Sequence, residues 1–375
     1  IVFGDWSSDV CSSDLRRLGH HTPFLLYGGA VLVLTATLMT GLLFTASRWS
    51  PGALALLLLC GPAILGVSHL SVSTVSWLIS LLLAPRTLPR IDFADGIPAN
   101  CRTMVVVPTM LSSAEGVRSL LESLEVCFLA NRESHLHFAL LTDLLDAPAE
   151  TMPGDSELVS LAQTGIEDLN RKYSGERSDA FFLCHRPRLW NGQEGVWMGW
   201  ERKRGKLAEF NAFLRGRAQE RFAAIVGCVE ILPAVKFVIT LETDTQLPRG
   251  AAGQLAGTLA HPLNRPRFDP EVGRVVEGYS ILQPRVGVSL PSAGRSWFAR
   301  IFATEPGMDP YTRAVSDVYQ DVFGEGSYIG KGIYDVDAFE HALGGRFPEN
   351  RILSHDLLEG SYAREIGRAS CRERV

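Results

Sequence analysis

Charged side chains are absent from two long stretches of this sequence. The first covers residues 24–44, and the second covers 52–84, where His69 is the single basic group. Each is longer than the roughly 20 residues that a helix needs to cross the hydrocarbon core of a bilayer. We therefore expect two transmembrane helices within a membrane region at 16–85. The alternative, a signal peptide and one buried helix, fits poorly because both stretches are too long and no small-residue cleavage site follows the first.

Basic residues are nearly absent from the segment between the two stretches. An arginine pair at 16–17 precedes the first stretch, Arg86 and Arg90 follow the second, and only Arg48 lies between them. Basic flanks stay on the cytoplasmic side of a membrane. The pattern therefore predicts that the chain after the second stretch lies in the cytoplasm, with the lipid bilayer as a partner.

Paired cysteines and an excess of basic charge are absent too. The 7 cysteines are scattered, without a CxxC pair, a His-Cys metal spacing or a disulfide framework. This usage agrees with a reducing compartment. The net charge of -5 gives no reason to expect a nucleic-acid partner.

The two ends of the chain share neither periodicity nor composition with the segments that they flank. Residues 5–15 read DWSSDVCSSDL and residues 367–375 read GRASCRERV. Both resemble translated sequencing adapters, so we expect residues 1–15 and 366–375 to be non-native flanks. Under this interpretation the chain is an internal fragment, and further domains of the full-length protein are missing.

After the membrane region, short apolar runs alternate with segments of helical spacing. We expect strands at 104–107, 136–142, 180–184 and 236–241, and helices at 117–128, 158–169 and 206–217. Asp155 or Ser156 is a plausible N-cap of the second helix. The alternation predicts an α/β domain at 86–365, with a parallel sheet and helices on both faces. In open sheets of this kind, ligands bind at the carboxyl ends of the strands.

Two acids follow the last expected strand without a basic residue between them. Glu242 and Asp244 end the apolar run, and burying them there without compensation would cost several kcal/mol each. Residues i and i+2 of a strand face the same way, so a Mg²⁺ or Mn²⁺ ion shared with substrate phosphates would turn their repulsion into attraction. Two alternatives stay open, namely a solvated loop and a carboxylate pair for glycoside hydrolysis.

A phosphate site also needs cations, and the segment GWERKRGKLAEFN supplies them. Four basic residues stand directly before an expected helix, whose N-terminal amides add positive potential: Arg202, Lys203, Arg204 and Lys206. The alternative is a solvated basic face. The position of the cluster between the third and fourth strands favours the phosphate site.

A glycine-rich segment, GEGSYIGKG at 324–332, is not a phosphate-binding loop. The spacing before Lys331 is wrong, and Gly332 replaces the required Ser or Thr. We interpret it as a flexible turn that lets the backbone approach a bulky ligand. Gly326 and Tyr328 are its candidate ligand contacts.

An acid also stands in the segment ILSHDLLEG at 352–360. Asp356 follows a short apolar run and precedes a helix-like segment. One carboxylate within hydrogen-bond reach is enough to accept the proton of an attacking hydroxyl, so Asp356 is the candidate base. The alternative is a helix cap beside a surface histidine, His355.

In this order, the motifs VVVPT, KRGKLAEFN, TDTQLPRG, GEGSYIGKG and LSHDLLEG resemble an inverting glycosyltransferase of the GT-A fold. More narrowly, the chain from about 86 to 364 resembles the glucosyltransferase domain of bacterial cyclic β-1,2-glucan synthases, glycosyltransferase family 84. The resemblance implies a mixed, mostly parallel sheet. It also implies an enzyme of the bacterial inner membrane that takes UDP-glucose from the cytoplasm and extends a glucan acceptor.

The resemblance also implies roles for individual residues. Thr109 and Asp143 would contact the uridine, and Lys206 would lie by the diphosphate. Glu242 and Asp244 would form the DxD-type triplet, with Asp244 on the metal, and Asp356 would be the base. Candidate acceptor contacts are Gly326, Tyr328 and three tryptophans, Trp190, Trp197 and Trp200. The tryptophans could stack on sugar rings or be ordinary core aromatics.

The sequence departs from the wider class at two positions. Glu242 replaces the usual Asp, so its ligand could be ribose or water, and His355 replaces the usual Glu before the base. Two other functions stay open. One is a cellulose-synthase-like transferase that makes another linkage, and the other is a non-catalytic membrane protein that binds nucleotide sugars.

Overall fold

A computed structural model describes much of the chain between residues 23 and 367. The described residues are 23–48, 52–82, 88–175, 177, 179–284, 297, 320, 322–324, 326, 328–352 and 355–367. The chain divides into two compact units, one of 1–86 with 286–325 and one of 87–285 with 326–375. Of the flanks expected at 1–15 and 366–375, the structure describes only Ile366 and Gly367.

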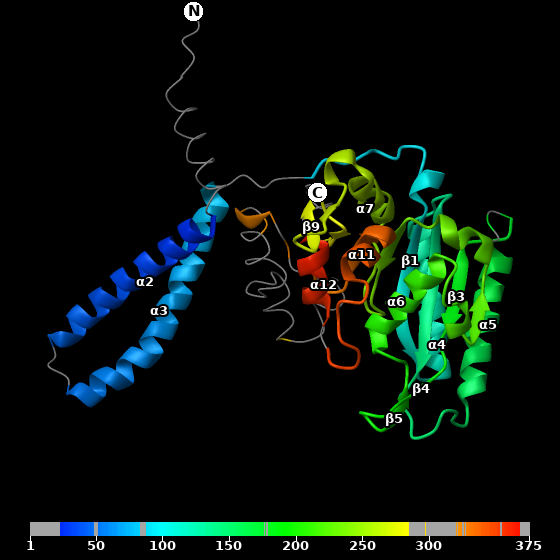
Figure 1. Cartoon of the computed structure of the whole chain (residues 1–375), viewed down its shortest axis with the longest axis horizontal. Coiled ribbons are helices and arrows are strands. Elements are labelled where there is room, and N and C mark those ends of the chain that lie inside the picture. The colour runs from blue at the N-terminus through cyan, green and yellow to red at the C-terminus, as the bar shows by residue number, and fades with distance from the viewer. Residues whose placement is uncertain are drawn as a thin grey trace, which may run out of the picture. The chain divides into compact units, whose positions relative to one another are not determined.

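Two long apolar helices, α2 (Pro23–Ser47) and α3 (Ala53–Leu82), belong to the first unit (Figure 1). The Tyr27 hydroxyl and the Ser76 Oγ lie 3.2 Å apart and join the two helices. By length and composition, α2 and the segment Cys60–Ile79 of α3 could each cross a membrane, as the sequence predicted. Only 0% and 11% of these segments are buried, so they do not fit core helices of a soluble domain.

The second unit contains a mixed sheet in the order β12-β10-β11-β7-β1-β2-β3-β6 (Figure 1). Its strands are β1 Thr103–Leu111, β2 Leu136–Leu144, β3 Phe181–His185, β6 Ala224–Val226, β7 Phe237–Thr240, β10 Ile281–Leu282, β11 Gly332–Asp335 and β12 Glu365–Ile366. β1 pairs in parallel with β2 and β7, β2 with β3, and β10 with β12, whereas β6 and β11 run antiparallel to their neighbours. The expected, mostly parallel sheet is confirmed.

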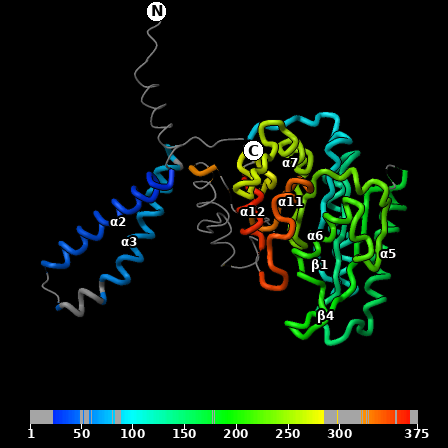
Figure 2. Tube along the Cα trace, in the orientation of Figure 1, coloured from blue at the N-terminus to red at the C-terminus, as the bar shows by residue number. Residues whose placement is uncertain are grey.

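Alternate side chains of the strands pack into two apolar cores, one on each face of the sheet. Val105 and Phe138 pack on one face, and their neighbours Val106 and Ala139 pack on the other, because successive residues of a strand face opposite sides. Helices α4 (Ala114–Ala130), α5 (Asp155–Lys172) and α7 (Ala251–Ala260) cover the first face, and α6 (Arg202–Leu214), α11 (Val336–Leu343) and α12 (Asp356–Ala363) contribute to the second. Figure 2 shows the course of α5, α6, α7, α11 and α12 within the second unit. The prediction of helices on both faces is therefore confirmed.

Two local predictions about helix starts are wrong. The N-cap of α5 is Gly154, in the left-handed region with φ of 90°, rather than Asp155 or Ser156. The Asp155 carboxylate instead accepts from the Met152 amide and pairs with a buried arginine. Helix α6 begins at Arg202, so the basic cluster lies inside its first turns and not before it.

Two small hairpins complete the described strands. β4 (Leu189–Asn191) pairs with β5 (Val196–Met198), and β8 (Arg267–Asp269) pairs with β9 (Arg274–Glu277), both antiparallel. The first of these connects β3 to α6 and carries two of the tryptophans that the sequence singled out.

Candidate functional site

The functional candidates gather where the central parallel strands end. β1, β2 and β7 run in the same direction, so the segments that follow them leave from one edge of the sheet. β11 runs the other way, and its first residue, Gly332, pairs with Thr240 at the end of β7. The glycine-rich segment before β11 therefore meets the acid triplet after β7.

The two acids after β7 lie in a turn rather than in the strand. β7 ends at Thr240, and the side chains of Glu242 and Asp244 are 41% and 80% exposed. The premise that both are buried is wrong, because the chain leaves the sheet before it reaches them. In their exposure, the two acids match the solvated-loop alternative. Their compensating cations in this structure are lysines: Lys331 Nζ lies 2.8 Å from Glu242 Oε2 and 4.0 Å from Asp244 Oδ1, and Lys203 Nζ lies 3.5 Å from Glu242 Oε1.

The Lys203 ammonium connects the acid turn to the glycine-rich segment and to the candidate base. It donates to the Gly330 carbonyl at 3.0 Å and lies 3.9 Å from Asp356 Oδ1. Gly330 has a φ of +79°, and a Cβ there would lie 2.3 Å from Lys203 Nζ and 2.7 Å from Asp356 Oδ1. Only glycine therefore allows this approach.

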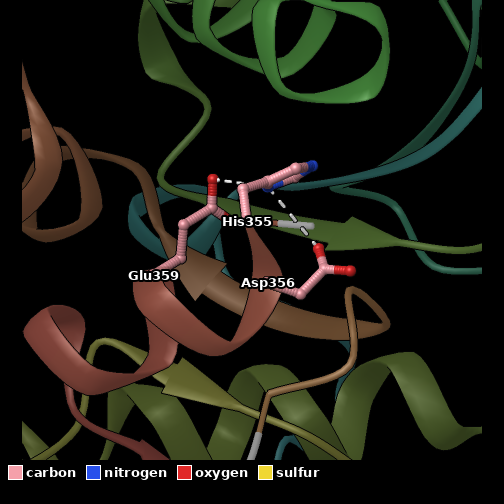
Figure 3. A group of neighbouring side chains, drawn as sticks. All are labelled: His355, Asp356 and Glu359. Atoms are coloured by element: carbon pink, nitrogen blue, oxygen red, sulfur yellow. Dashed lines mark hydrogen bonds and ion pairs between the residues drawn. The ribbon is translucent and has the colours of Figure 1, made fainter. Parts of the chain in front are cut away.

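Asp356 is the first residue of α12 and lies beside a buried acid and imidazole pair (Figure 3). His355 Nδ1 lies 2.8 Å from Glu359 Oε1 and 3.6 Å from Asp356 Oδ1. His355 and Glu359 are nearly buried, whereas the Asp356 side chain is 26% exposed. No described residue donates a hydrogen bond to Asp356 Oδ1. The helix-cap alternative is wrong, since the N-cap is His355 and its side chain makes no cap hydrogen bond.

These three residues could also hold a metal ion. One donor atom from each of His355, Asp356 and Glu359 lies within 4.8 Å of the others. Imidazole nitrogen and carboxylate oxygen together suit a transition metal more than Mg²⁺. The sequence did not predict this group, although its spacing of one and four positions at a helix start was a usable signal.

Asp143, Arg186 and Lys206 form a buried ion cluster near the end of β2. Arg186 binds the Asp143 carboxylate through Nε at 2.8 Å and Nη2 at 2.9 Å, and Lys206 Nζ lies 2.9 Å from Asp143 Oδ2. Gly199 covers this carboxylate, because a Cβ there would lie 2.3 Å from Asp143 Oδ2. Burial lowers the pKa of the Lys206 ammonium, and the Asp143 charge opposes that shift.

Thr109 belongs to the same cluster, since its carbonyl accepts a hydrogen bond from Lys206 Nζ at 2.5 Å. The structure thus brings together Thr109, Asp143 and Lys206, whose contacts with uridine and diphosphate stay predictions. Sequence reasoning missed Arg186, which is 2% exposed. Its position directly after β3, matching Asp143 near the end of β2, was the available signal.

The tryptophans lie on and beside the β4-β5 hairpin. Trp190 and Trp197 are cross-strand partners with ring centroids 5.9 Å apart, and Trp190 is 52% exposed. Asn350 docks on the hairpin through two amide hydrogen bonds with Asn191, at 2.9 and 2.8 Å. This contact joins the hairpin to the segment that leads to Asp356.

The remaining acceptor candidates lie deeper in the unit. Trp200 is half-buried, and a Cβ at Gly205 would lie 2.3 Å from its carbonyl oxygen. Tyr328 is 2% exposed and packs in the core of the α6 face, and a Cβ at Gly326 would meet Glu365. The acceptor contacts of Trp200, Gly326 and Tyr328 stay predictions.

This chain is similar to a segment of a curated protein. No protein-family model matches the chain. Among curated proteins, the chain is similar to the cyclic beta-(1,2)-glucan synthase NdvB of Rhizobium meliloti (strain 1021), with 44% identity over 342 residues. The match covers 91% of this chain, and the chain spans 12% of the length of that relative. The resemblance predicted from the motifs is confirmed.

Proposed function

From its similarity to a segment of a cyclic beta-(1,2)-glucan synthase, we propose that this chain is an inverting glucosyltransferase. It transfers glucose from UDP-glucose to a growing β-1,2-glucan. One observation carries the proposal: Lys203 lies 3.5 Å from Glu242 and 3.9 Å from Asp356. Lys203 thus brings the proposed diphosphate site at Glu242 close to the proposed base, Asp356, so that one bound sugar could contact both. Both lie at the edge of the sheet where α/β proteins bind their ligands.

The acid turn has the chemistry that a divalent ion needs. Asp244 is 80% exposed, and among the described residues its carboxylate accepts a hydrogen bond only from Thr245 Oγ1, at 3.3 Å. Carboxylate oxygens are the ligands that Mg²⁺ and Mn²⁺ prefer, so Asp244, with Glu242, would hold the ion. The ion would supply positive charge to the leaving diphosphate. The group of His355, Asp356 and Glu359 is a weaker candidate for the metal site, because His355 Nδ1 and Glu359 Oε1 already form a hydrogen bond at 2.8 Å.

The proposed reaction is a single displacement. The Asp356 carboxylate accepts the proton of an acceptor hydroxyl, whose oxygen forms a bond to the anomeric carbon of the glucose. The bond from that carbon to the UDP oxygen breaks on the opposite face, and the electron pair leaves with UDP. An α-linked donor thus gives a β-linked product. The Asp356 side chain is 26% exposed, but its Oδ1 is buried and accepts from no described residue, so Oδ2 is the oxygen that would receive the proton.

The hydrolase alternative fits the site poorly. Glycosidases place two carboxyl groups on opposite sides of the bond, at least about 5 Å apart across a cleft. Here Glu242 and Asp244 lie on one turn, and the same Lys331 ammonium lies within 4.0 Å of both. Both acids therefore approach a ligand from one side.

We place the enzyme in the inner membrane of a bacterium, with the catalytic domain at 86–365 facing the cytoplasm. Two apolar helices of spanning length and the basic flanks of the uncharged stretches support this placement.

The exposed Trp190 ring is our candidate platform for the glucan acceptor, because sugar rings stack on aromatic faces.

Labelled UDP-glucose tests the proposal. Membranes that contain the chain are incubated with labelled UDP-glucose, and the linkages of the labelled glucan are determined. We expect β-1,2 linkages and release of one UDP for each glucose transferred. Another linkage would favour the cellulose-synthase-like alternative, and UDP binding without transfer would favour the non-catalytic one.

A further inference from the structure

Lys331 carries a charge that the proposed mechanism has not used. Its ammonium is 2.8 Å from Glu242 Oε2 and 4.0 Å from Asp244 Oδ1, and its side chain is 17% exposed. It stands between Gly330 and Gly332, which both have positive φ. The segment lacks the spacing of a phosphate loop, yet its lysine points at the acids that would bind the diphosphate's metal ion.

The lysine and the metal ion would compete for one carboxylate. An ion held by Glu242 and Asp244 would stand close to the ammonium, and two cations at that distance repel each other. The lysine must then find another anion within reach. The diphosphate that accompanies the metal ion is the group of opposite charge at this edge of the sheet.

We propose that Lys331 binds the diphosphate of the sugar nucleotide, and that Glu242 holds its ammonium until the divalent ion takes that carboxylate. This inference rests on the proposed function and deepens it. Lys331 becomes a donor-binding residue, and Glu242 becomes the point at which metal binding and nucleotide binding are coupled.

The surroundings of Lys331 restrict the movement to its side chain. Gly332 is tied into the sheet opposite Thr240, and the Gly330 carbonyl accepts from Lys203 at 3.0 Å. The backbone on both sides is therefore held. The flexible four-carbon stem of a lysine can carry its ammonium from one anion to another, so metal ion and diphosphate should bind with positive coupling.

Two affinities of the variant K331M test the proposal, measured on the whole chain in detergent micelles. Without nucleotide, Mn²⁺ should bind K331M about fivefold more tightly, which is the strength of a good partly exposed ion pair. With saturating Mn²⁺, UDP should bind K331M about tenfold or more weakly, because a charged hydrogen bond is lost. The control is K172M, which removes a lysine from the exposed pair with Glu125 and should change neither affinity.

The variant E242Q gives a signature that a structural role of Lys331 would not produce. In EDTA, E242Q should bind UDP severalfold more tightly than the unaltered chain, because its lysine is already released. The double variant E242Q/K331M should lose this gain. If K331M binds Mn²⁺ and UDP as the unaltered chain does, or if the gain persists in the double variant, this inference is overturned. If the unaltered chain itself binds no UDP, the proposed function fails with it.

Discussion

At the scale of single residues, the buried ion cluster of Asp143, Arg186 and Lys206 carries the largest electrostatic cost in the second unit. Arg186 and Lys206 are 2% and 3% exposed, and both depend on the Asp143 carboxylate. Arg186 also reaches Glu209 at 2.8 Å. Buried charges are tolerable only while every partner is present, so this cluster fixes the end of β2 against the start of α6.

Replacing Asp143 by Ala should destabilise the second unit by about 3–5 kcal/mol, because two buried cations lose their anion. Urea unfolding followed by tryptophan fluorescence measures the change. The matched control is D168A, which breaks an ion pair with Arg171 whose side chains are 56% and 73% exposed and should cost about 1 kcal/mol or less. Equal losses in D143A and D168A would contradict the role of the cluster.

His185 makes stability depend on pH. Burial lowers the pKa of His185 from 6.5 to about 4, so the unfolded chain binds more protons than the folded chain between these values. Stability contributed by the neutral imidazole is complete above pH 6.5 and is lost as the pH falls toward 4, at up to about 1.4 kcal/mol per pH unit. Between pH 7 and 5, H185Q should lose less stability than the unaltered chain in urea unfolding. Equal losses would contradict this account.

At the scale of elements, long apolar strands were predictable and short ones were not. β1 and β2, with nine residues each, carry their own hydrophobic pattern, whereas β10 and β12 have two residues each and exist only through their neighbours. The acid turn was misjudged for a related reason. Nothing local in Leu241–Glu242 marks where pairing stops, because Gly332 of a distant segment sets the end of β7.

The candidate site was predictable as a set of motifs but not as a set of contacts. Glu242, Lys203 and Asp356 are far apart in the sequence, and each could be placed at the carboxyl edge of the sheet from its position after a strand or before a helix. Their contacts depend on Gly330 and Lys331. That segment lacks the spacing of a phosphate loop, and its lysine was therefore overlooked.

The segment at 330–332 gives the test at this scale. In G330A, the new Cβ would lie 2.3 Å from Lys203 Nζ, so Lys203 and Asp356 must move apart. A displacement of about 1 Å costs on the order of 10²-fold in catalytic rate. The rate of glucose transfer should fall by that factor in G330A. The free energy of unfolding in urea should fall by about as much in G330A as in the control. The control is G345A, where φ is likewise positive, at +70°, but no atom lies within 4 Å of the new Cβ. A G330A rate equal to that of G345A would contradict the proposed contact.

At the scale of the whole molecule, the two compact units differ in the kind of surface that they supply. The unit with α2 and α3 supplies apolar surface of membrane-spanning length, and the other supplies the sheet edge with its charges. In our proposal the first unit anchors the chain in the membrane. The chain spans 12% of the length of its relative.

The most direct test of the central claim compares D356N with the unaltered chain in the same membranes. UDP binding in the presence of Mg²⁺ or Mn²⁺ is measured by calorimetry, and transfer from labelled UDP-glucose is measured as released UDP. General-base catalysis contributes about 10²–10⁴-fold. We predict a loss of transfer of that size in D356N with UDP affinity unchanged within about twofold. Transfer at the unaltered rate in D356N would contradict the account.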